Sequence, residues 1–151
     1  MLQRTGYNQM DGVRESDMYK FEYSNSSNLF LIEQMHDEII NKIECNSSNL
    51  ILKFDELHFK HFDSFFDRAE MIFSGFDDIY SDISIELYKM DGVKIKNGEK
   101  LYLDDFYNKF QDEKVNFEVL DMFVGYKSFL ICGNSSKAKS PGYNKFRLTI
   151  N

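Results

Sequence analysis

The chain is short of positive charge. Its 151 residues include 18 lysines and arginines against 25 aspartates and glutamates, which gives a net charge of −7 and a pI near 4.9. Affinity for nucleic acids comes largely from lysine and arginine displacing the counterions of phosphates. The deficit therefore argues against DNA or RNA as a partner. The acidic excess favours solubility, and it would also steer the chain towards a basic protein partner.

Long apolar runs are absent as well. A membrane-spanning helix needs about 18 or more consecutive apolar residues, and no stretch of the sequence approaches this. The first residues also contain no apolar core of the length found in signal peptides. We therefore predict a cytoplasmic protein with no membrane partner.

Cysteine is scarce and does not have the spacing of a metal site. Cys45 and Cys132 both lie in apolar runs that read as strands. Such residues are typical of buried free thiols in a cytosolic protein, although the sequence leaves a bridge between them open. We predict no metal and no cofactor.

The common catalytic motifs are missing. The sequence contains no glycine-rich phosphate loop, no G-x-S-x-G turn and no H-E-x-x-H helix. His58 and His61 follow a predicted strand, where an odd spacing turns side chains to opposite faces. His36 could be oriented by Asp37 for ligation or base catalysis. We predict a non-enzymatic protein without catalytic residues, and keep a metal-dependent enzyme using His36, His58 or His61 as an alternative.

Aromatic residues are abundant, with 15 phenylalanines and 9 tyrosines. Both favour β-strands. Alternation of apolar and polar residues predicts one hairpin over residues 38–59 and a second between residues 69–73 and 83–88. Turns are predicted at Asp91-Gly92 and at Asn97-Gly98. Because apolar and aromatic side chains also line ligand pockets, a small-molecule-binding β-domain is a further alternative.

The remaining segments complete the predicted fold. A short helix is expected over residues 104–111, a helical turn over 61–68, central strands over 116–124 and 127–132, and a strand nearer an edge over 143–150. Residues 1–28 form a polar N-terminal segment, either an edge element that includes a short strand at 18–23 or partly disordered, and residues 29–151 form a single β-rich domain. The fold class is α+β and predominantly antiparallel β: a meandering sheet, or a partly open barrel or sandwich, with one or two short helices.

An acidic and aromatic loop, residues 75–82, is the candidate binding site. Exposed aromatic side chains bordered by charge are typical of protein interfaces. We predict that Asp77, Asp78, Tyr80 and Asp82 contact a partner. The alternative is a solvated hairpin loop whose aromatic side chains pack into the core.

Residues 35–43, followed by residues 50–54, resemble the opening hairpin of small bacterial proteins, several of which are immunity proteins of toxin systems. In that pattern a His-Asp pair leads into an Ile-rich strand, a polar turn and a Leu-x-Leu-x-Phe strand. The resemblance implies a small β-rich protein that neutralises a cognate toxin by binding it. An acidic protein of this kind would suit a basic toxin, often a nuclease.

Overall fold

The computed structural model describes residues 2–10, 13–21, 35–46, 48–59, 64–110, 114–125, 128–137 and 142–151. Their strands form two antiparallel sheets. The first has the order β2 (Val13–Phe21), β1 (Leu2–Met10), β6 (Ser64–Ser74), β5 (Asn49–Phe59) and β4 (Lys42–Cys45). The second has the order β3 (Ile39–Ile40), β9 (Val115–Gly125), β10 (Ser128–Lys137), β11 (Lys145–Ile150), β7 (Ile83–Asp91) and β8 (Lys94–Tyr102). Two short helices, α2 (Ile79–Asp82) and α3 (Leu103–Phe110), complete the described part.

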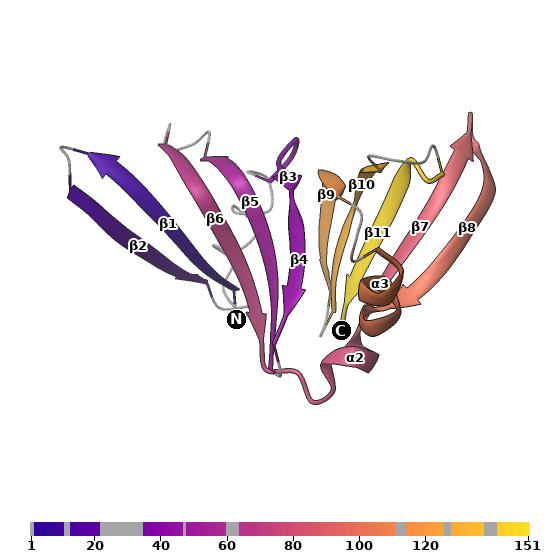
Figure 1. Ribbon diagram of the computed structural model, residues 1–151, viewed down its shortest axis with the longest axis horizontal. Helices are drawn as coiled ribbons and strands as arrows, with labels where there is room; N and C mark the ends of the chain where they lie inside the picture. Colours follow the sequence, from indigo (N-terminus) through magenta and orange to yellow (C-terminus); the bar gives the residue numbers. More distant parts are fainter. Residues whose placement is uncertain are drawn as a thin grey trace.

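One stretch of chain joins the two sheets. β3 pairs with β9 of the second sheet, and β4, which follows after Asn41, pairs with β5 of the first. The backbone N–H of Asn41 donates to the carbonyl oxygen of Lys53 at 2.8 Å, so pairing with the first sheet begins at this residue. Figure 1 shows the two sheets side by side, the first from β2 to β4 on the left and the second from β9 to β8 on the right. The predicted α+β, predominantly antiparallel fold is confirmed, and the described strands do not close into a barrel.

The apolar core is built from one face of each sheet. Period-two alternation sends Leu50 and Leu52 of β5, and Ile83, Ile85 and Leu87 of β7, to the same interior. The two sheets meet where the ring of Phe73 in β6 packs edge to face on that of Phe129 in β10, with centroids 5.2 Å apart. The core therefore belongs to both sheets.

Helix α3 covers part of the same interior. Its buried face carries Leu103, Phe106 and Phe110, which recur at the helical spacing. The hydroxyl of Tyr107 donates to the carbonyl oxygen of Ile43 in β4 at 2.6 Å. This hydrogen bond ties a helix that follows the second sheet to a strand of the first.

Several local predictions are confirmed. β4 and β5 form the first predicted hairpin, with Cys45 paired to Leu50. β7 and β8 turn next to Asp91-Gly92, where Gly92 has a φ of 63°, a conformation that favours glycine. The helix occupies residues 103–110, and β9 and β10 have neighbours on both sides.

Other predictions are wrong because the partner of a strand depends on distant residues. The predicted hairpin between residues 69–73 and 83–88 does not form: β6 pairs with β1 and β5, whereas β7 pairs with β8 and β11. Residues 75–82 instead connect the two sheets. Asn97-Gly98 lies inside β8 and makes no turn. The strand at 145–150 lies between β10 and β7, away from an edge.

At the N-terminus, β1 and β2 form a hairpin that extends the first sheet beyond β6. β2 includes part of the short strand expected at residues 18–23. The predicted boundary between residues 28 and 29 lies outside the described residues and stays a prediction. β6 begins at Ser64, so the helical turn expected over residues 61–68 is wrong from that residue on, and residues 61–63 lie outside the described part. No helix of the described part is long and apolar enough to cross a membrane.

Candidate partner-binding surface

The segment predicted to contact a partner folds into α2, a single helical turn. Asp78 is its N-cap: Oδ1 accepts from the backbone N–H of Tyr80 at 3.1 Å, and Oδ2 accepts from the hydroxyl of Ser81 at 2.6 Å. The hydrogen bond from Ser81, followed by those from backbone N–H groups, holds the pKa of Asp78 below its usual range. Asp82 Oδ2 accepts in return from the backbone N–H of Asp78 at 3.4 Å. Asp78 and Asp82 therefore shape the turn.

The other two predicted residues face solvent. Ile79 is buried and anchors the turn to the core, while Asp77 is exposed and the Tyr80 side chain remains 50% exposed. An aromatic ring left half in water beside charged groups is typical of interface residues. The structure thus brings Asp77, Asp78, Tyr80 and Asp82 together in one turn, and their role in binding stays a prediction.

The register of β7 and β8 places further residues beside α2, which the sequence did not predict. Ser84 pairs with Tyr102, so α2, which precedes β7, and α3, which follows β8, leave the sheet at the same end. The two helices contact each other and lie side by side (Figure 1). The first turn of α3 carries Asp104 and Asp105, both exposed. Negative charge in the first turn of a helix complements the helix dipole.

We call this end of the molecule the acidic end, defined by Asp77, Asp78, Asp82, Asp104 and Asp105. Among the described residues, none of these five carboxylates forms an ion pair. Four glutamates on the sheets do form ion pairs: Glu44 and Glu70 pair with Lys53, Glu86 with Arg147 and Glu99 with Lys109. The acidic end also exposes the ring of Tyr80 and that of Tyr102. It combines uncompensated negative charge with aromatic surface.

The histidines do not form a metal site in the described part. His36 Nδ1 lies 3.0 Å from Asp37 Oδ1 on an exposed turn. His58 lies at the end of β5, where its ring stacks on that of Phe65 with centroids 4.0 Å apart. His61 lies outside the described residues. In the part of the chain that the structure describes, no three histidine, cysteine or acidic side chains gather as metal ligands would.

The two cysteines lie in different sheets and are both free. Cys45 is in β4 and Cys132 in β10, each half-buried, so the bridge that the sequence left open does not form. Burial raises the pKa of the Cys132 thiol. A thiol of this kind is poorly reactive because the thiolate is the nucleophile.

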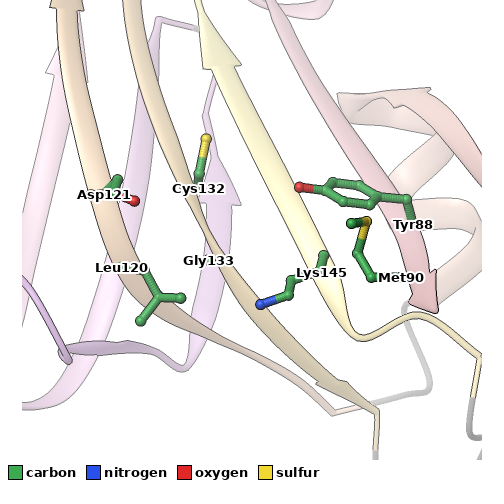
Figure 2. Close-up of a pocket in the computed structure, with 7 residues that line it drawn as sticks. All are labelled: Tyr88, Met90, Leu120, Asp121, Cys132, Gly133 and Lys145. Carbon is green, nitrogen blue, oxygen red and sulfur yellow. The ribbon is translucent and has the colours of Figure 1, made fainter. Parts of the chain in front are cut away.

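A shallow cavity of about 200 Å³ lies on the face of the second sheet opposite the core (Figure 2). Side chains of β7, β9, β10 and β11 surround it, with Tyr88 and Met90 on one side and Leu120 on the other. Lys145 reaches across it but donates to Asn134 Oδ1 at 2.6 Å, and Asn134 in turn donates to Glu118. Pockets that enclose a small ligand usually measure about 300–1,000 Å³. This hollow is too small and too open to favour the small-molecule alternative.

No family model, curated protein or solved structure matches this chain.

Proposed function

We propose that the protein is a non-enzymatic binding protein whose acidic end receives a basic protein partner. The observation that carries the proposal is the gathering of five carboxylates without an ion pair at one end, beside exposed tyrosine rings, while Glu44, Glu70, Glu86 and Glu99 of the sheets are paired. Complementary charge accelerates association and selects the partner. A carboxylate that forms no ion pair within the protein remains available to pair with a cationic side chain of the partner.

The partner class follows from the same chemistry. Lysine and arginine side chains would pair with Asp77, Asp104 and Asp105, and Tyr80 would supply apolar contact area. A bacterial toxin with a basic substrate-binding surface has this character. The resemblance of the opening hairpin to that of immunity proteins implies that the protein neutralises such a toxin by binding it, and we include this in the proposal.

The test is capture of the partner from a lysate of the host cell, with three versions of the protein as bait. Asp77→Asn, Asp104→Asn and Asp105→Asn together remove three charges from the acidic end. Asp55→Asn, Glu56→Gln and Asp67→Asn remove the same charge from exposed positions on β5 and β6. Asp78 and Asp82 are left unchanged because they shape α2.

We expect the wild type and the β5–β6 variant to retain the same basic protein, and the acidic-end variant to bind it about tenfold more weakly, since each exposed ion pair contributes little alone. Raising salt from about 0.1 M to about 1 M shortens the Debye length from about 10 Å to about 3 Å and should release the partner. Equal retention by both variants, or retention that salt does not weaken, would contradict the proposal.

A further inference from the structure

Strand β8 is the edge of the second sheet. Its pairing partner is β7, and the order of the sheet ends with it, so one side of its backbone is unpaired among the described residues. Figure 1 shows no described element beyond it. The strand is nine residues long, about 30 Å at the usual rise per residue. Such a row of unpaired N–H and C=O groups is a template for another strand.

The edge is also unusually open. Seven of its nine residues are exposed, and the two that are half-buried, Glu99 and Leu101, face α3 and the core. Val93 in the adjoining turn is 94% exposed, and Ile95 in β8 is 67% exposed. Proteins commonly protect edges with proline, with short strands or with charged side chains, above all lysine. β8 is long and has no proline, so its lysines are what keeps other strands from pairing with it. A bulge between Lys89 and Met90 is confined to the turn end, and pairing is regular from Asn97 to Tyr102.

Charge decides which strand the edge can accept. β8 carries Lys94, Lys96 and Lys100, and Lys94 and Lys96 make no ion pair within the described part. Its one acidic residue, Glu99, is already paired with Lys109 at 2.6 Å. A second copy that paired through its own β8 would bring lysines against lysines, which is unfavourable. The carboxylates of an acidic strand would instead be attracted to these lysines.

We propose that the free edge of β8 binds an extended acidic peptide segment of a partner protein by strand addition. The peptide backbone pairs with β8, its carboxylates pair with Lys94, Lys96 and Lys100, and its apolar residues contact Ile95. This site reaches the acidic end only at Tyr102, and it takes a partner of the opposite charge.

The test uses a fluorescent peptide of about eight residues in which glutamate alternates with valine. Its binding to the full chain is measured by fluorescence anisotropy at about 0.01 M salt, where the Debye length is about 30 Å. Two further peptides have the same sequence with N-methyl groups on alternate residues. The methyl groups block one edge of the extended strand in the first peptide and the other edge in the second. Since only one edge of the peptide would pair with β8, one N-methylated peptide should bind as the parent does and the other should not bind.

On the protein side, Lys94→Gln, Lys96→Gln and Lys100→Gln together should weaken binding by about tenfold. The acidic-end variant with Asp77→Asn, Asp104→Asn and Asp105→Asn is the matched control and should not weaken it. The two proposals can therefore fail separately: the lysine variant tests the β8 edge, and the acidic-end variant tests the proposed function.

Three outcomes would overturn the proposal. The first is no binding of the acidic peptide even at low salt. The second is equal binding of the two N-methylated peptides, which would indicate charge attraction without strand pairing. The third is a dimer of the wild type, detected by sedimentation and tighter in the lysine variant, which would assign the edge to β8 of a second copy of the chain.

Discussion

At the scale of single residues, Gly133 is the position that the fold constrains most tightly. Asp121 pairs with Cys132 and Val119 with Gly133, so Leu120 is an extra residue in β9 and forms a bulge. A Cβ atom on Gly133 would lie 1.8 Å from the carbonyl oxygen of Glu118. Only glycine allows the two backbones to approach in this way.

We therefore expect Gly133→Ala to lower the free energy of unfolding by about 1–3 kcal/mol or more, because the bulge has to open. Urea denaturation followed by circular dichroism would measure it. Gly142→Ala is the control, since its Cβ would meet no atom within 4 Å, and its effect should stay within about 1 kcal/mol. An equal loss in both variants would show that close packing at the bulge is not the cause.

This constraint also marks the limit of what the sequence could predict. The apolar runs at residues 116–124 and 127–132 predict two central strands, and this is confirmed. The bulge is not visible there, because Gly133 follows the second run and reads as the beginning of a loop. In the same way, alternation identified β7 but not its partners. Asp104 and Asp105 join the candidate surface only through the pairing of Ser84 with Tyr102, a register that no local pattern contains.

At the scale of elements, the contact between α3 and β4 depends on Tyr107. Its hydroxyl donates to the carbonyl oxygen of Ile43, and burial, followed by the neighbouring Cys45, raises the pKa of the phenol above its ordinary value near 10. Because the folded state favours the neutral phenol, the stability that this group contributes is fully present below pH 10 and is lost as the pH rises above it.

We expect the free energy of unfolding to fall between about pH 10 and pH 11 more steeply in the wild type than in Tyr107→Phe. At pH 7 the same substitution should cost about 1 kcal/mol, because the hydrogen bond is lost. Tyr80→Phe is the control, since its ring is half exposed, and it should keep the alkaline fall of the wild type. An identical pH dependence in Tyr107→Phe would contradict the assignment.

At the scale of the whole molecule, the two sheets share one core and should therefore unfold together. The stretch of chain that contains β3 and β4 contributes one strand to each sheet, and the rings of Phe73 and Phe129 meet across them. A sheet that separated from the other would expose these rings to water, along with the buried face of α3. Exposure of shared apolar surface is what makes the unfolding of a small domain cooperative.

The expected result is a single transition in which amides of β5 and β11 exchange their hydrogens with the same free energy of opening. Phe129→Leu should lower that free energy by about 1 kcal/mol in β5 as well as in β11, although Phe129 belongs to the second sheet. Phe123→Leu, at an exposed position of β9, should change neither. If Phe129→Leu left exchange in β5 unchanged, the sheets would be independent units, and a partner bound at the acidic end would stabilise only the second.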